Sequence, residues 1–114
     1  MKIQIHHEYP CLLVPDENGK QKRFPIKLRE ASIGRDPSND ICIRDHLVSK
    51  FHAKLIVSNQ SVTVVDLESA NKTRVNGQIV THSAVGFGDE LQFARVKCQL
   101  VLHHADALRA SKSV

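Results

Sequence analysis

The chain has 114 residues and a mass of 12.8 kDa, a size that suits one domain. Hydrophobic residues make up 41% of it, which is enough for a buried core and excludes wholesale disorder. The net charge of +4 is spread along the sequence without a concentrated basic face, so direct nucleic-acid binding is not expected. No apolar run reaches the roughly 18 residues of a membrane span, and no signal peptide is visible, so we expect an intracellular protein without membrane contact.

Short apolar segments separated by turn residues recur along the whole chain. Val and Ile far outnumber Leu, and branched side chains favour strands. Near the C-terminus, Val96, Cys98 and Leu100 alternate with polar residues, as on a strand with one buried face. In chain order, strands are predicted over residues 2–6, 11–14, 23–28, 32–34, 41–43, 53–58, 61–66, 73–75, 78–80, 90–93 and 96–103.

The turns between these segments define the expected fold. Asn76-Gly77 lies between two predicted strands and is typical of a two-residue hairpin turn. The regular strand spacing predicts an all-β protein, an antiparallel β-sandwich of about 10–11 strands with binding loops at one end. Residues 1–104 are predicted to form this domain, and residues 105–114 a C-terminal tail or linker that begins with a helical turn or two.

Cysteine and histidine spacings do not indicate a metal site. Cys11, Cys42 and Cys98 are an odd number at wide spacings, which favours buried, inert core residues over disulfides or zinc ligands. The adjacent histidines at 6–7 and 103–104 point to opposite faces of a regular strand and so do not chelate one ion together. No metal and no cofactor are expected.

Polar residues suited to an anionic peptide lie in the predicted loops. The planar guanidinium of Arg35 suits two-point recognition of a phosphate or carboxylate. Ser49 offers a hydroxyl donor and Lys50 a positive charge, while the amide of Asn71 can both donate to and accept from a peptide backbone. Because loops on a rigid scaffold commonly carry binding groups, we expect these residues to converge at one end of the sandwich.

This series of loop motifs resembles the forkhead-associated (FHA) domain, a β-sandwich that binds phosphothreonine peptides. The family pattern reads Gly-Arg, Ser-x-x-His, Ser-x-Asn-Gly-Thr and Asn-Gly, and the order of the motifs is far more specific than any one of them. The matching residues are Gly34-Arg35, Ser49-Lys50-Phe51-His52, Ser69-Ala70-Asn71-Lys72-Thr73 and Asn76-Gly77, with further matches at Asp40-Ile41, Asp66-Leu67 and Gly88-Asp89-Glu90-Leu91.

The resemblance implies a role for each matching position. Arg35 and Ser49 would bind the phosphate, with Lys50 in support. Asn71 would fix the peptide backbone just after the phosphothreonine, and Leu47 lies where the family recognises the third residue after it. The positions that match loop-shaping residues of the family are Gly34, His52, Thr73, Asn76 and Gly77.

Two residues depart from the family pattern. Lys72 replaces a glycine, so this turn either avoids a positive φ or is strained, and the lysine adds positive charge beside the phosphate. Ala70 replaces a threonine that contacts the phosphate in many members. These departures motivate a second hypothesis, a degenerate FHA domain that acts mainly in homodimerisation or in phosphate-independent protein interaction.

A second resemblance is to one subgroup of FHA domains. Residues 90–94, followed by Cys98, resemble the N-terminal FHA domain of DNA-damage checkpoint mediators. That resemblance implies a nuclear scaffold protein of the DNA damage response, a chain that is the head of a longer protein, and a homodimer. Phosphothreonine-containing protein segments are the expected partners.

Ser49 and His52 also admit a different class of protein, a small Ser-His hydrolase. The chain has no G-x-S-x-G motif, and a spacing of three residues within one loop suits a histidine that packs beneath that loop. We therefore expect no enzymatic activity and no catalytic residue.

Overall fold

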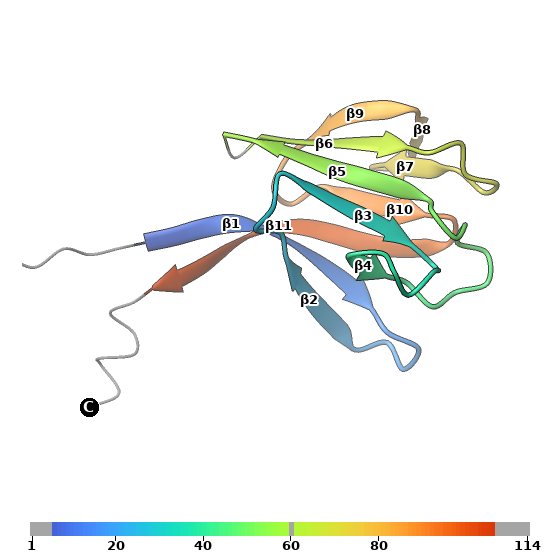
Figure 1. The fold of residues 1–114 in the computed structure, drawn as a ribbon, viewed down its shortest axis with the longest axis horizontal. Coiled ribbons are helices and arrows are strands. Elements are labelled where there is room, and N and C mark those ends of the chain that lie inside the picture. The colour runs from blue at the N-terminus through green and yellow to red at the C-terminus, as the bar shows by residue number, and fades with distance from the viewer. Residues whose placement is uncertain (1–5, 60, 107–114) are drawn as a thin grey trace, which may run out of the picture.

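The computed structural model describes residues 6–59 and 61–106, which form two packed β-sheets (Figure 1). This confirms the predicted all-β sandwich. The described part of the chain contains no helix that is long and apolar enough to cross a membrane. The strands are β1 (His6–Pro15), β2 (Gln21–Pro25), β3 (Glu30–Gly34), β4 (Ile41–Cys42), β5 (Ala53–Ser58), β6 (Ser61–Asp66), β7 (Thr73–Val75), β8 (Gln78–Val80), β9 (His82–Val85), β10 (Glu90–Phe93) and β11 (Val96–Asp106).

One sheet has six strands in the order β2-β1-β11-β10-β7-β8, and the other has five in the order β4-β3-β5-β6-β9. Neighbouring strands pair antiparallel, with the exception of the short parallel pair β3 and β4. Strands β2 and β4 are therefore the end strands of different sheets, and they lie along the same side of the sandwich (Figure 1).

The core lies between the facing surfaces of the two sheets. Leu12, Leu55, Phe93 and Leu100 are completely buried there, and burying a side chain of this size contributes about 1.5–3 kcal/mol. Strand β5 shows the expected alternation, since Leu55 points into the core while the neighbouring Lys54 forms an ion pair with Glu30 at 3.6 Å.

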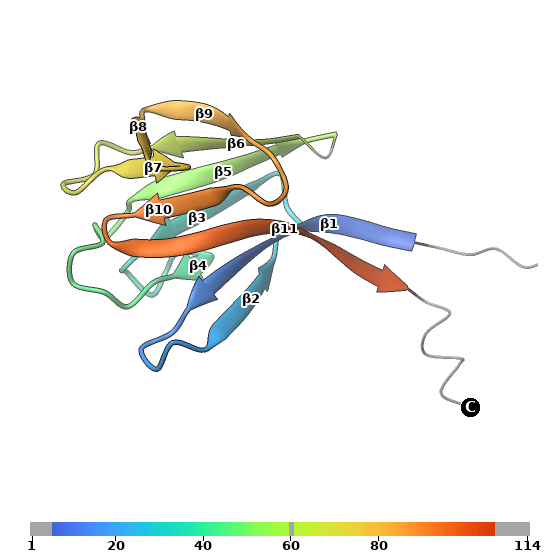
Figure 2. The same cartoon turned by 180° about the vertical axis from the view of Figure 1, so that it is seen from behind.

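Strands β1 and β11 pair over a long stretch, from Leu13 opposite Gln99 to His6 opposite Asp106. Their outer halves extend beyond the other strands as an arm at one end of the molecule (Figure 2). The rings of Tyr9 on β1 and His103 on β11 stack with their centroids 4.9 Å apart.

The described strands differ from the predicted ones in several places, and β2, for example, ends at Pro25 rather than at residue 28. Strand β9 is absent from the sequence prediction. Strand β11 runs through residues 105–106, where the sequence predicted the start of a helical tail. The predicted strand at 2–6 falls almost wholly outside the described residues, and His6 instead begins β1.

Two of the three cysteines are core residues, as predicted. Cys11 and Cys98 are buried, and burial raises the pKa of Cys98 to about 12. Cys42 differs, because it is only half-buried on the end strand β4, where its Sγ lies 3.4 Å from the carbonyl oxygen of Arg35.

The loops β3–β4, β4–β5, β6–β7 and β10–β11 lie at the end of the sandwich away from the arm (Figure 1). Hydrogen bonds connect them: the backbone N–H of Arg35 donates to the carbonyl of Ser49 at 3.0 Å. Arg95 of the β10–β11 loop donates to the carboxylate of Asp45 in the β4–β5 loop at 2.8 Å. The polar motifs of the sequence therefore share one connected surface.

Candidate functional site

Arg35 directly follows β3 and is exposed at the loop end. Its Nε donates a hydrogen bond to the carbonyl oxygen of Val48 at 3.0 Å. Among the described residues its two Nη groups have no hydrogen-bond partner. The guanidinium is thus held in place by one edge while its other donors face solvent, which is an arrangement suited to an anion.

Ser49 lies next to Arg35 and is partly buried. Its Oγ accepts a hydrogen bond from the backbone N–H of Ala70 at 3.0 Å, so the β4–β5 and β6–β7 loops meet at this hydroxyl. The hydroxyl proton makes no hydrogen bond to any described residue and remains available to a ligand.

Asn71 extends this connection between loops. Its Nδ2 donates to the carbonyl oxygen of Leu47 at 2.7 Å, which leaves Oδ1 without a partner in the described chain. The amide therefore presents a fixed acceptor for the N–H of an extended peptide. Leu47 itself is half-buried and packs against the core, and so contributes its backbone to the site as well as its side chain.

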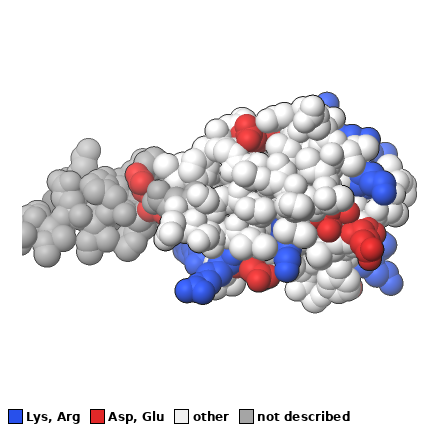
Figure 3. Space-filling model, turned by 90° about the horizontal axis from the view of Figure 1, so that it is seen from above, with Lys and Arg blue, Asp and Glu red and all other residues white. Residues whose placement is uncertain are grey.

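Lys50 and Lys72 are the exposed lysines of these loops. Asp36 lies close enough that the charges of Lys50 and Arg35 help to hold its pKa below the usual value, after the larger effect of hydrogen bonds from Ser38. Lys and Arg gather at this end of the surface together with Asp and Glu (Figure 3). An anion would therefore be recognised by placed donors more than by a general positive field.

Lys72 adopts the backbone conformation that the family provides with glycine. Its φ is +73°, a region that non-glycine residues rarely occupy. Of the two alternatives that the sequence left open, the turn is therefore the strained one. The carbonyl of Lys72 accepts hydrogen bonds from Nε2 of His52 and from the backbone N–H of Ala94, each at 3.0 Å, and these hold the turn in place.

His52 supports the loops from beneath. Its side chain is completely buried, and Nδ1 accepts the backbone N–H of Ser49 at 3.1 Å while Nε2 faces the carbonyl of Lys72. These partners require the neutral tautomer with the proton on Nε2. Burial lowers the pKa of His52, against the opposing effects of the Lys72 carbonyl and the charge of Asp66.

This arrangement does not provide a Ser-His catalytic pair. Both ring nitrogens of His52 form hydrogen bonds with backbone groups. The ring accepts the backbone N–H of Ser49 and makes no bond to Oγ of that residue. The histidine has no free nitrogen with which to take the hydroxyl proton of Ser49.

Gly34 is required by a close approach between two loops. A Cβ at this position would overlap the carbonyl oxygen of Lys50, so no larger residue fits without movement. The same carbonyl accepts hydrogen bonds from the backbone N–H of Asp36 and from Nδ2 of Asn39. Asn39 is buried, and a second bond from its Nδ2 to the carbonyl of Asp36 closes the β3–β4 loop.

The β6–β7 loop is organised around Asp66. Its Oδ1 accepts hydrogen bonds from the hydroxyls of Ser69 and Thr73, and both of these side chains are buried. Burial alone would raise the pKa of Asp66, but these hydrogen bonds outweigh it, and the pKa is lowered. A carboxylate kept ionised in this way fixes the backbone that carries Asn71.

The hairpin predicted at Asn76-Gly77 connects β7 to β8. Both turn residues have positive φ, +49° and +88°. Oδ1 of Asn76 accepts the backbone N–H of Glu90 at 2.9 Å, which ties the hairpin to β10. Its role is to shape the sheet rather than to line the site.

Sequence reasoning identified the exposed donors but missed much of their support. It assigned no role to Asn39, and it included Asp66 and Ser69 only as motif positions without a stated role. The spacing Asp66-x-x-Ser69 is a usable signal, because a carboxylate followed by a hydroxyl three residues later is typical of side-chain-bonded turns.

The fold and these loops define a class of protein, the β-sandwich that presents hydrogen-bonded polar loops at one end. The FHA domain profile matches residues 31–94, more than half of the chain. The chain therefore belongs to the FHA domain family, and it is a non-enzymatic interaction protein, as the sequence predicts.

Curated relatives and solved structures agree with this assignment. Glycogen accumulation regulator GarA of Mycobacterium tuberculosis is 36% identical over 75 residues, 66% of this chain and 46% of that protein. The oxoglutarate dehydrogenase inhibitor of Corynebacterium jeikeium is 33% identical, over 66% of this chain and 52% of that protein. This chain thus matches about half the length of these relatives. A solved structure from a study of phosphothreonine-dependent FHA domain interactions has a TM-score of 0.76 at 23% identity, covering 83% of this chain and 97% of that one.

These relatives correct the finer expectations. The prediction of a nuclear location is wrong, because the relatives are proteins of mycobacteria and corynebacteria, which have no nucleus. They also give no support to the checkpoint-mediator subgroup or to a DNA damage response. The short match at residues 90–94 and Cys98 that suggested this subgroup consists of strand and core positions, which serve the packing of the sandwich.

Proposed function

We propose that this chain binds phosphothreonine-containing protein segments through the loops that carry Arg35, Ser49 and Asn71. One observation carries the proposal. Each of these three side chains is fixed by a hydrogen bond to the backbone of a neighbouring loop, and each keeps a polar group that has no partner among the described residues. Side chains held in this way lose little conformational freedom when the ligand binds.

Each residue has a distinct role in the proposed complex. The two Nη groups of Arg35 and the hydroxyl of Ser49 donate to phosphate oxygens, while Lys50 and Lys72 add charge. Oδ1 of Asn71 accepts the backbone N–H that follows the phosphothreonine, and Leu47 faces the residues beyond it. Charge-assisted hydrogen bonds contribute about 1.5–3 kcal/mol each, so after ordering costs we expect affinity on the order of micromolar.

The relatives support a regulatory role inside the cell. They are named as a regulator of glycogen accumulation and as inhibitors of an enzyme. By analogy, this chain would control a phosphorylated partner by binding it, without chemistry of its own. The alternative of a homodimer or a phosphate-independent contact stays a prediction, motivated by Ala70, whose side chain offers no hydroxyl to the phosphate.

The test is a fluorescence-polarisation titration with a degenerate phosphothreonine peptide pool. Unphosphorylated and phosphoserine pools are titrated alongside it, and the phosphoserine pool should bind more weakly, as in the family. Arg35→Ala should weaken binding to the phosphothreonine pool about 100-fold, the equivalent of two lost charge-assisted bonds. Arg29→Ala, at an exposed arginine between β2 and β3, is the matched control and should bind normally.

Equal affinity for the phosphorylated and unphosphorylated pools would refute the proposal. The homodimer or phosphate-independent hypothesis would then take its place. Sedimentation velocity over a range of protein concentrations separates these two, because only a homodimer sediments faster as the concentration rises.

A further inference from the structure

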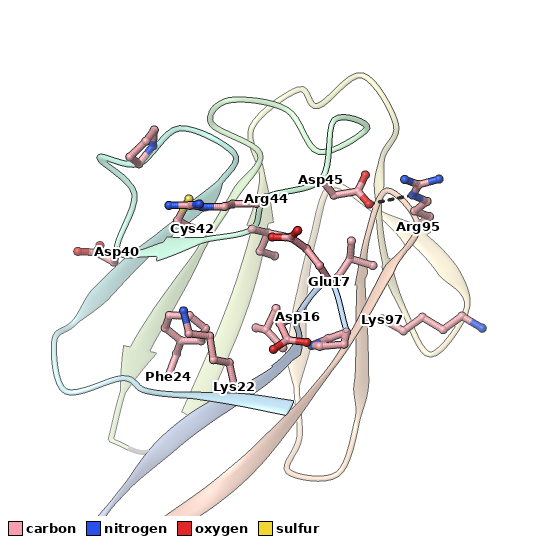
Figure 4. A pocket seen from close by; sticks show the side chains of 15 residues that line it. Asp16, Glu17, Lys22, Phe24, Asp40, Cys42, Arg44, Asp45, Arg95 and Lys97 are labelled. Atoms are coloured by element: carbon pink, nitrogen blue, oxygen red, sulfur yellow. Dashed lines mark hydrogen bonds and ion pairs between the residues drawn. The ribbon is translucent and has the colours of Figure 1, made fainter. Parts of the chain in front are cut away.

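A groove of about 640 Å³ opens on the side of the sandwich where β2 and β4, the end strands of the two sheets, lie opposite each other (Figure 4). Cys42 and Arg44 lie along one wall, and Arg95 and Lys97 along the other. Neither β2 nor β4 has a second strand neighbour in the described sheets. The open edges of these two strands therefore suit an extended segment of chain.

The groove reaches down to the hydrophobic core. Val14 and Ile43 are core residues at its floor, and the partly buried Phe24 and Val96 pack beside them. An apolar side chain placed here would contact these residues and leave water, which is favourable.

The rim carries four acids and four cations, but most of the acids are already occupied. Asp16 accepts two backbone N–H groups of its own turn, and Asp40 accepts the backbone N–H and hydroxyl of Ser32. Asp45 is paired with Arg95, whereas Glu17 makes no interaction with any described residue.

Two of the cations, in contrast, are unoccupied. Arg44 and Lys97 make no hydrogen bond, ion pair or ring contact with any described residue. Against one unpaired acid, Glu17, the described part of the rim thus offers one unpaired cation on each wall, with which carboxylates of a ligand can pair.

The groove is continuous with the candidate phosphothreonine site. Oδ1 of Asp45 accepts the backbone N–H of Leu47 at 2.9 Å, and the carbonyl of the same Leu47 accepts Nδ2 of Asn71. A peptide that leaves the phosphate and passes Asn71 and Leu47 therefore arrives at the Asp45–Arg95 pair, which forms the rim of the groove.

We propose that this groove binds the part of the phosphorylated partner that follows the phosphothreonine, as an extended segment with an apolar side chain between acidic residues. The inference rests on the proposed phosphothreonine function and adds a second contact region to it. Because Leu47 lies where the family recognises the third residue after the phosphothreonine, the segment would begin at about the fourth residue, and six extended residues of about 3.3 Å each span about 20 Å. Phosphate would fix the position of the partner, and the groove would select among phosphorylated partners.

The test compares two phosphothreonine pools that are degenerate at the three positions on either side of the phosphothreonine. One pool continues with Gly-Ser-Gly-Ser-Gly-Ser and the other with Asp-Glu-Leu-Val-Glu-Asp. We expect the acidic-apolar pool to bind about 10-fold more tightly, the gain for one buried apolar side chain with flanking charges. An equal affinity for both pools overturns the inference. It leaves the proposed function intact, since that function is measured with the Gly-Ser pool.

A charge-reversal variant tests whether the 10-fold gain in affinity comes from the groove. The double variant Arg44→Glu and Lys97→Glu should lose the 10-fold difference between the pools and keep its affinity for the Gly-Ser pool. The matched control is Lys27→Glu and Arg29→Glu, which makes the same change in charge at exposed sites away from the groove and should retain the difference. A difference that persists in the groove variant means that the tail binds elsewhere, and this also overturns the inference.

The half-buried thiol of Cys42 gives an independent measurement. A chloroacetamide group on the apolar position of the acidic-apolar peptide should alkylate this thiol, since Cys11 and Cys98 are buried. Mass spectrometry should show the adduct in the native protein and none in Cys42→Ser. A native protein that stays unlabelled while the peptide is bound contradicts the proposed path of the ligand.

Discussion

Nε2 of His52 and the carbonyl oxygen of Lys72 lie 3.0 Å apart, and this hydrogen bond joins the β4–β5 loop to the β6–β7 loop. Because His52 also accepts the backbone N–H of Ser49, one buried ring sets the spacing between these two loops. The ring packs edge-on against Phe93, so the core determines its position.

His52→Phe should lower the free energy of unfolding by about 2–4 kcal/mol, because it leaves the backbone N–H of Ser49 without its partner and removes one of the two hydrogen bonds to the carbonyl of Lys72. Urea denaturation followed by circular dichroism measures this change. His82→Phe, at an exposed histidine on β9, is the control and should alter stability by less than about 0.5 kcal/mol. Equal effects of the two variants would show that the hydrogen bonds of His52 contribute little.

Stability should also depend on pH through His52. Its pKa in the folded protein is lowered, so as the pH falls below about 6.5 the unfolded chain takes up a proton before the folded one does. The contribution of His52 is thus present above about pH 6.5 and is lost as the pH falls toward the folded pKa, by at most about 1.4 kcal/mol per pH unit. Urea midpoints measured across this range should fall more steeply for the native protein than for His52→Phe.

Lys72→Gly should separate stability from binding. Glycine relieves the positive φ at this position, and after its own entropic cost we expect a gain of about 0.5–1 kcal/mol. Affinity for the phosphothreonine pool should fall several-fold, because a charge beside the phosphate is lost. Ala70→Gly, two residues away and without a positive φ, should instead lose about 0.5 kcal/mol. A destabilised Lys72→Gly would mean that the lysine side chain itself supports the turn.

Gly34→Ala should disrupt the site through its packing. The added Cβ collides with the carbonyl of Lys50 and lies 2.7 Å from Nδ2 of Asn39, so the loops must separate, at a cost of about 2–3 kcal/mol. Thermal unfolding and the peptide titration together measure the effect. Gly86→Ala is the matched control, because its Cβ would find its nearest neighbour at an ordinary 3.5 Å. Similar behaviour of the two alanine variants would contradict the close approach at Gly34.

Asn71→Ala should reduce affinity about 10-fold, because the acceptor for the peptide backbone and the bond to Leu47 are both removed. The residue is exposed, so the free energy of unfolding should change by less than about 1 kcal/mol. The loss should be the same for phosphothreonine and phosphoserine pools, since the amide contacts the backbone. Undiminished affinity would place the peptide on a different path.

Side-chain pattern was sufficient to predict most of the fold. The alternation in 53–58 and 61–66 and the Asn76-Gly77 turn each correspond to the described strands. Strand β9 was missed because His82-Ser83-Ala84 has no apolar alternation, and its place in the sheet comes from pairing with β6. Such pairing is a property of the assembled sheet and leaves little trace in a short local segment.

The site was predictable only on its ligand-facing side. Arg35, Ser49 and Asn71 carry distinctive side chains, and their order in the sequence pointed to the family. Their supports are mainly backbone carbonyls, those of Val48 and Leu47, and a carbonyl is the same at every residue. Which carbonyl meets which side chain is decided by loop geometry, and sequence pattern does not encode that directly.

The pairing of β1 with β11 also affects how the domain can be connected to other proteins. His6 and Asp106 are opposite each other in the ladder, so the two ends of the described domain lie side by side, away from the loops that carry Arg35, Ser49 and Asn71. A domain with adjacent junctions can be spliced into a surface turn of a host protein with little strain on either. The arm would then serve as a stalk that holds the recognition loops outward, a geometry well suited to a grafted biosensor.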